Sequence, residues 1–319
     1  MCKFFSKLFR CLYEFLNIIL KMIFGLLPVI LILWLFNNYR INRKLQNELD
    51  AQKKKQFTWQ MGNIAAWTCG TIRDTDTVIV LTPEYYEDFY NEKRIAAYNV
   101  NRRANYVLTA FKRNFTDPFL VARDISYLVK ELTKTYSCVI IVGHSKSSTI
   151  NIAMLNYLSD ADYDMMVNIS SPYSGTILTM PEKIYELVST RKIFNWEYGK
   201  AFYDFYCGMF DGDMADKIIR EDSPFLSQLD YSKIDKDKFI NITAKSGLIS
   251  FLYDFWNFDA EGISLPLLDS FLDLDGDGLV PLKSQRANMP EDIKTIHLNA
   301  SHKSSYAIGV KKVLKDLEK

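Results

Sequence analysis

Residues 138–147 read CVIIVGHSKS, and the prediction of the fold starts from them. The apolar, β-branched run Cys138–Val142 is typical of a buried strand, and the residues after the motif are typical of a helix. The sequence GHSKS therefore falls on a sharp turn between a strand and a helix. Such a turn exposes a serine oxygen above a sheet and places the first helical N–H groups beside it. We predict that Ser145 is a nucleophile and that the Lys146 N–H is an oxyanion donor.

The last residue of this motif departs from the usual pattern, which is Gly-x-Ser-x-Gly. Ser147 is small, but its side chain can strain a turn in which the backbone and the helix approach closely. The alternative interpretation is an ordinary Gly-Ser turn with a serine at the helix N-cap. The strand–turn–helix context favours the nucleophile.

Short apolar strands alternate with amphipathic helices along the rest of the chain. Alternation of this kind is typical of a parallel sheet with helices on both faces, so we predict the α/β class with a mostly parallel sheet. Further strands are predicted at 77–82, 104–111, 165–169, 239–243 and 293–298, and helices at 118–134, 148–158 and 303–318.

The N-terminal part of the chain has a different composition. Residues 18–36 are apolar except for Lys21, and a membrane-spanning helix needs about 20 apolar residues. A signal peptide would have a shorter apolar core and a small-residue cleavage site, and a buried soluble helix would have a polar stripe. We therefore predict a tail at 1–17, an uncleaved transmembrane anchor at 18–36, and a polar stalk and entry segment at 37–74, leading into a globular domain at 75–319.

Composition excludes several other classes. The net charge is +1 and no basic stripe is present, so no nucleic-acid partner is expected. The five cysteines include no C-x-x-C pair, so neither a zinc site nor a disulfide framework is indicated. Their odd number and the positive residues after the anchor weakly favour a cytoplasmic domain. The sequence does not indicate an oligomeric state.

Three histidines are candidates for the base that would activate the serine. His302 lies in a loop after the last predicted strand, which suits a base that must reach the serine hydroxyl. His144 lies inside the turn and is expected to be a packing or orienting residue. His297 falls within a strand pattern and is expected to be half-buried. We therefore predict His302 as the base.

The matching acid is predicted in the segment 273–281, which reads DLDGDGLVP. A carboxylate here would fix the tautomer of the histidine, and the chain order is then Ser, Asp, His. The pattern also matches the first half of a calcium loop, with Asp273 and Asp275 as ligands. Position twelve of that loop would be Ser284, which cannot replace the bidentate Glu. The two interpretations are compatible if Asp277 is the catalytic acid.

Four stretches together resemble bacterial triacylglycerol lipases and related esterases of the α/β-hydrolase superfamily. They are GHSKS at 143–147, NISSPYSGT at 168–176, DSPFLSQL at 222–229 and DGDGLVPLKSQ at 275–285. The resemblance covers roughly residues 75–315 and implies the α/β-hydrolase fold. It implies that Ser145, Asp277 and His302 form a catalytic triad and that Tyr173 replaces a histidine common in the family.

One departure from the family concerns the oxyanion hole. These lipases usually carry His-Gly after the first central strand, where this chain reads Thr82-Pro83-Glu84. Pro83 has no N–H to donate, so Glu84 is the predicted second donor beside Lys146. This departure and Ser147 motivate an alternative function. In that alternative the chain is a weak or inactive hydrolase-like membrane scaffold that binds a lipid or protein partner.

The predicted substrate follows from the aromatic content of an insertion at about 174–236, which we predict to be a helical cap. A second apolar stretch covers 248–272. Caps of this kind line acyl pockets or act as lids. Together with the anchor in the lipid bilayer, they suggest a lipid-like substrate. We therefore predict a membrane-anchored serine hydrolase that cleaves carboxylic esters and needs no cofactor.

Overall fold

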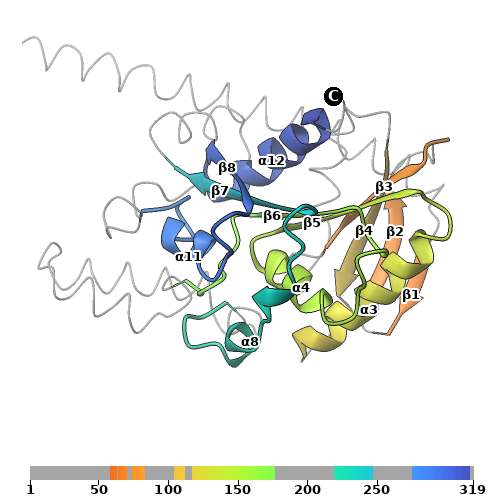
Figure 1. The fold of residues 1–319 in the computed structure, drawn as a ribbon, viewed down its shortest axis with the longest axis horizontal. Coiled ribbons are helices and arrows are strands. Elements are labelled where there is room, and N and C mark those ends of the chain that lie inside the picture. Colours follow the sequence, from red (N-terminus) through yellow and green to blue (C-terminus); the bar gives the residue numbers. More distant parts are fainter. Residues whose placement is uncertain are drawn as a thin grey trace, which may run out of the picture.

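The centre of the molecule is an eight-stranded sheet with the order β1-β2-β4-β3-β5-β6-β7-β8 (Figure 1). The computed structural model describes residues 58–62, 64–69, 74–82, 104–111, 117–176, 219–246 and 275–316. The strands are β1 (Thr58–Met61), β2 (Ile64–Cys69), β3 (Thr77–Leu81), β4 (Asn105–Phe111), β5 (Cys138–His144), β6 (Met165–Ile169), β7 (Phe239–Lys245) and β8 (Lys294–Asn299). The six strands from β4 to β8 along this order are parallel, whereas β1 and β2 pair antiparallel.

Helices cover both faces of the sheet. They are α3 (Pro118–Leu132), α4 (Lys146–Met154), α8 (Pro224–Ser227), α11 (Leu282–Arg286) and α12 (His302–Asp316), with a 3-10 turn η2 at Tyr231–Lys233. Helices α3 and α4 lie on one face and α12 on the other (Figure 1). The sequence prediction of an α/β fold with a parallel sheet between helices is confirmed.

The core consists of two apolar clusters, one on each side of the sheet. Neighbouring residues of β5 illustrate the division, because Ile141 packs towards α3 and α4 whereas Ile140 packs in the cluster that contains Val310 of α12. Side chains alternate between the two faces of a strand, so a strand buried on both faces reads as a continuous apolar run. This is why the run at 138–142 predicted a central strand.

The start of α3 shows how local sequence fixes a helix boundary. Asp117 Oδ1 accepts a hydrogen bond from Phe119 N at 2.8 Å, and Pro118 occupies the first turn. An aspartate N-cap satisfies one of the unpaired N–H groups, and the fixed φ of proline suits the first helical position. The helix predicted at 118–134 therefore begins at 118.

The sheet begins earlier than the sequence predicted. Strands β1 and β2 fall within residues 37–74, the predicted polar stalk and entry segment before the domain at 75–319. Ile64, Ala66 and Thr68 are buried, and β2 pairs with β4 along its whole length. The alternation of buried residues is short and lies beside a highly polar segment, so it did not stand out. The described sheet therefore begins at Thr58, within this segment.

Several predicted regions lie outside the described residues. These are the tail at 1–17, the anchor at 18–36, the first part of the stalk and most of the cap range. Within the described ranges, no helix combines the length and hydropathy that crossing a bilayer requires. The described end of the cap range packs into the core, where the Phe225 ring of α8 lies 5.1 Å from that of Phe119, between centroids.

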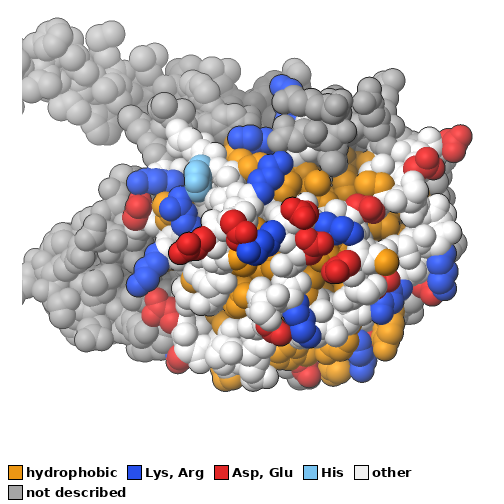
Figure 2. Space-filling model, viewed as in Figure 1, with side chains coloured by type: hydrophobic (Ala, Val, Ile, Leu, Met, Phe, Trp, Pro, Cys, Tyr) orange, Lys and Arg blue, Asp and Glu red, His pale blue; other side chains and the backbone are white. Residues whose placement is uncertain are grey.

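The charged side chains of the described surface are mixed in sign. On the face shown in Figure 2, Lys and Arg side chains are interspersed with Asp and Glu. This distribution fits the net charge of +1.

Candidate active site

Ser145 lies on the turn between β5 and α4 with a backbone conformation that non-glycine residues rarely adopt. Its φ is 55° and its ψ is −128°. Such a conformation costs about 1–3 kcal/mol and persists only where the surrounding structure enforces it. The backbone N–H of Ser145 donates to Ile169 O at the end of β6, at 2.8 Å. The neighbouring strand therefore holds the turn that presents this serine.

Gly143 makes the close approach of β5 and α4 at this turn. A Cβ atom at this position would lie 2.8 Å from Ser148 N and 2.9 Å from Ser148 Cα. We expect Gly143→Ala to lower the free energy of unfolding by about 1–3 kcal/mol, because backbone atoms must move. The measurement is urea unfolding. The control is Gly309→Ala, whose Cβ would meet the flexible end of Ile169, and equal losses in the two variants would contradict the argument.

Ser147 stabilises the turn instead of only occupying the place of a glycine. Its Oγ donates to His144 O at 2.7 Å and accepts from His144 N at 2.8 Å. The side chain is fully buried. The departure from Gly-x-Ser-x-Gly thus gives the turn two hydrogen bonds that a glycine would lack.

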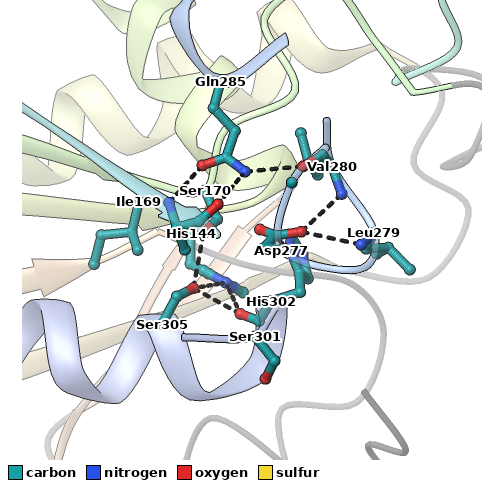
Figure 3. Close-up of polar contacts among 12 residues, drawn as sticks. His144, Ile169, Ser170, Asp277, Leu279, Val280, Gln285, Ser301, His302 and Ser305 are labelled. Carbon is teal, nitrogen blue, oxygen red and sulfur yellow. Dashed lines mark hydrogen bonds and ion pairs between the residues drawn. The ribbon is translucent and has the colours of Figure 1, made fainter. Parts of the chain in front are cut away.

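Asp277 and His302 form a hydrogen-bonded pair (Figure 3), on the side of the sheet where β5 ends. His302 Nδ1 lies 2.8 Å from Asp277 Oδ2, and Asp277 is 0% exposed. The other carboxylate oxygen, Oδ1, accepts from Leu279 N at 3.0 Å and from Val280 N at 2.8 Å. An ionised carboxylate only accepts, so the proton lies on Nδ1 and a neutral ring presents Nε2 as an acceptor. That is the tautomer a general base requires.

A backbone contact further fixes His302. Its N–H donates to Asp277 O at 2.8 Å. His302 is the first residue of α12, whereas the sequence placed it in a loop before a helix at 303. The helix starts one residue earlier because the backbone N–H of His302 is satisfied by the carbonyl of Asp277.

Gln285 links the segment that carries Asp277 to strand β7 of the sheet. Its Nε2 donates to Ala244 O and to Val280 O, both at 2.9 Å, and its Oε1 accepts from Ala244 N at 2.7 Å. The side chain is fully buried. The sequence indicates no role for Gln285 beyond its place within the stretch 275–285.

The structure brings His302, and not His297, to Asp277. His297 is exposed on β8, where its Nδ1 lies 2.6 Å from Thr243 Oγ1. Partial burial lowers the pKa of His297, and the positive charges of Arg286 and Lys312 lower it further. His297 was expected to be half-buried, and it is more exposed than that.

His302 also lies beside the turn that carries the serine, since its ring centroid is 4.6 Å from that of His144. Between the described residues Ser145 and His302, no side-chain hydrogen bond is formed. In serine hydrolases this bond is often long and tightens only when substrate binds. The three predicted residues thus come from one edge of the sheet, and two of them are in direct contact.

The predicted oxyanion donors are described only in part. Lys146 is the first residue of α4, where the helix N-terminus carries a partial positive charge. Glu84 lies outside the described residues. Thr82 ends the described part of that segment, and its N and Oγ1 both lie 3.0 Å from Val142 O. This contact joins the end of β3 to β5 below the serine.

The structure describes one of the two predicted calcium ligands, Asp275. Asp275 forms an exposed ion pair with Lys245 at 2.7 Å, whereas Asp277 bonds to His302. Asp273 lies outside the described residues. Within the described ranges, no three or more His, Cys, Asp or Glu side chains come together as a metal site.

A mostly parallel sheet with a serine on a strand–turn–helix after a central strand, followed by an aspartate and a histidine, is the α/β-hydrolase arrangement. The chain has this fold. In structure it resembles bacterial lipases and carboxylesterases.

Comparison with solved structures gives similar proteins at low sequence identity. The Bacillus licheniformis lipase BlEst2 in mature form is 10% identical, with 79% of this chain and 97% of that chain covered and a TM-score of 0.48. A highly thermostable carboxyl esterase from Bacillus coagulans is 11% identical, with 82% and 98% covered and a TM-score of 0.42. The epoxide hydrolase VrEH1 from Vigna radiata is 12% identical, with 82% and 98% covered and a TM-score of 0.43. No protein-family model and no curated protein matches the sequence.

Proposed function

We propose that the chain is a serine hydrolase that cleaves carboxylic esters with Ser145, His302 and Asp277 as its catalytic residues. The observation that carries this proposal is the contact between the buried Asp277 and the half-buried His302, whose Oδ2 and Nδ1 atoms lie 2.8 Å apart, beside the turn that presents Ser145. A buried carboxylate that fixes the tautomer of a histidine at the edge of a sheet has a direct use in activating an alcohol.

The proposed reaction is acyl transfer in two steps. His302 Nε2 takes the proton of Ser145 Oγ as this oxygen attacks the ester carbonyl, and Asp277 stabilises the imidazolium that forms. The Lys146 N–H at the start of α4, with Glu84 N–H, stabilises the oxyanion. His302 then protonates the leaving alcohol. In the second step it activates a water molecule, which releases the acid and restores Ser145.

The proposal extends to a membrane-anchored enzyme with a lipid-like ester as substrate. The apolar segment 18–36 supports the anchor, and the aromatic range 174–236 supports a pocket for an acyl chain. A chain-length series of p-nitrophenyl esters tests the substrate class, because an acyl pocket gives a kcat/KM that rises with chain length.

A fluorophosphonate probe tests the nucleophile. We expect the wild-type chain to be labelled and Ser145→Ala to remain unlabelled, because the probe reacts only with an activated serine. The readout is the fluorescence or mass of the labelled protein.

Ser147→Gly is the matched control on the same turn, and it is expected to keep its labelling because it restores the usual pattern. Labelling that persists in Ser145→Ala would overturn the assignment of Ser145. A folded wild-type chain that is never labelled would favour the inactive scaffold, which Pro83 motivates.

A further inference from the structure

The backbone carbonyl of His302 receives two side-chain hydrogen bonds (Figure 3). His144 Nε2 lies 2.7 Å from His302 O, and Ser305 Oγ lies 2.7 Å from the same oxygen. These contacts are separate from those that Asp277 makes with the N–H and the ring of His302. The candidate base is therefore held through its backbone N–H, its backbone carbonyl and its ring.

The direction of each hydrogen bond follows from the acceptor. A carbonyl oxygen cannot donate, so His144 donates through a protonated Nε2 and Ser305 donates its hydroxyl proton. Ser305 Oγ must then accept from Ser170 Oγ, which lies 2.7 Å away. Burial lowers the pKa of His144 well below its ordinary value, and the neighbouring His302 lowers it further. His144 is thus neutral near pH 7, with its Nε2–H directed at His302 O.

The hydrogen bond from His144 to His302 O starts from a central strand of the sheet. His144 is the last residue of β5, the strand between β3 and β6, and is 2% exposed. Its ring packs against those of His302 and Tyr306, with centroid distances of 4.6 and 5.2 Å. Both partners belong to the first turns of α12. The side chain of His144 therefore connects the central strand that precedes Ser145 to the helix that begins with His302.

We propose that His144 is a positioning residue that sets the distance between His302 and Ser145 through its hydrogen bond to His302 O. This inference rests on the proposed hydrolase function. Without the bond, the first turn of α12 can shift relative to β5, and His302 moves relative to the serine. Catalytic groups must be held within about 0.5 Å of the productive geometry, and a misplacement of about 1 Å lowers the rate by about 10²-fold.

The test compares two substitutions of His144. His144→Leu replaces the imidazole by an apolar side chain of similar size that has no hydrogen-bond donor. We expect kcat to fall by about 10²-fold with KM nearly unchanged. His144→Gln places an amide N–H near the position of Nε2, and we expect kcat within about tenfold of the wild type. A role in packing alone would not favour glutamine over leucine at a buried site.

Two further measurements separate positioning from folding. Thermal unfolding shows whether each variant is folded at the assay temperature. Proton NMR detects the downfield resonance of the His302 Nδ1 proton shared with Asp277, which should persist in His144→Gln and broaden in His144→Leu. If His144→Leu does not fold, His144→Met replaces it, since this side chain also has no donor for His302 O. A lower kcat in His144→Met than in His144→Gln would then support the inference, and equal values or the reverse order would overturn it.

The outcomes also distinguish this inference from the proposed function. Ester hydrolysis that depends on Ser145 but is equally fast in wild type and His144→Leu overturns the positioning role alone. Equal losses in His144→Leu and His144→Gln likewise overturn it, because the donor would then be irrelevant. A wild-type chain without hydrolysis or probe labelling overturns the proposed function and, with it, the role of His144.

Discussion

Replacing His302 by alanine is expected to lower kcat for ester hydrolysis by about 10⁶-fold, because serine and histidine act as one unit in such sites. Without the imidazole, the proposed base that removes the proton of Ser145 Oγ and returns it to the leaving alcohol is lost. The measurement is the steady-state hydrolysis of a soluble p-nitrophenyl ester. KM is expected to change little, since His302 acts on the reacting atoms and not on the acyl chain.

His297→Ala is the matched control for this prediction. His297 is exposed and contacts Thr243 and Arg286, so its loss should change kcat by less than about twofold. A large loss in His297→Ala together with an active His302→Ala would refute the assignment of the base. A double variant of His302 and Ser145 is expected to be no slower than either single variant, because the two residues share one step.

The strands and helices around the serine could be predicted because their sequence patterns are long and unambiguous. The run at 138–142 is apolar throughout and became β5, and the periodic segment at 118–134 became α3. The pattern of β2 is different, since it alternates over a few residues only and gains its burial from pairing with β4. Short strands depend on tertiary pairing, so their sequence carries a weaker signal.

The Asp277–His302 contact could be anticipated because chain order limits the choice of histidine and the resemblance to lipases selects Asp277 among the neighbouring aspartates. His302 follows the last strand and Asp277 precedes it, which is the order that brings both to the edge where β5 ends. The residues that hold them could not be predicted in the same way. Gln285 bonds to the backbone of Ala244, which is distant in sequence, and Ser305 bonds to the carbonyl of His302 one turn earlier in α12. No sequence pattern of a glutamine or a serine indicates such partners.

The serine at 147 shows how a departure from a family pattern can be misjudged from the sequence. Replacing glycine by a larger residue suggests strain, since the sequence gives only the size of the side chain. The structure adds that its hydroxyl bonds to both backbone groups of His144. A local hydrogen bond of this kind offsets the steric effect, because serine readily bonds to nearby backbone groups in turns.

Replacing Asp277 by asparagine is expected to lower kcat by about 10⁴-fold while the protein remains folded. Asparagine has nearly the same shape, and its oxygen can still accept from Leu279 N and Val280 N. Its amide nitrogen would then face His302 Nδ1. Because that amide donates, the proton of His302 moves to Nε2, and the nitrogen nearest to Ser145 can no longer accept one. The comparison of kcat between variant and wild type measures the loss.

Asp275→Asn tests whether this loss belongs to the tautomer and not to the charge of the segment. Both substitutions remove one negative charge and lie two positions apart, but Asp275 is exposed and pairs with Lys245. Surface ion pairs contribute about 0–1 kcal/mol, so Asp275→Asn should change kcat and stability little. Equal losses of kcat in the two variants would indicate a long-range electrostatic effect and contradict the triad. A loss confined to Asp277→Asn, with a stable fold, points to the contact with His302, because asparagine can keep the hydrogen bonds from Leu279 N and Val280 N.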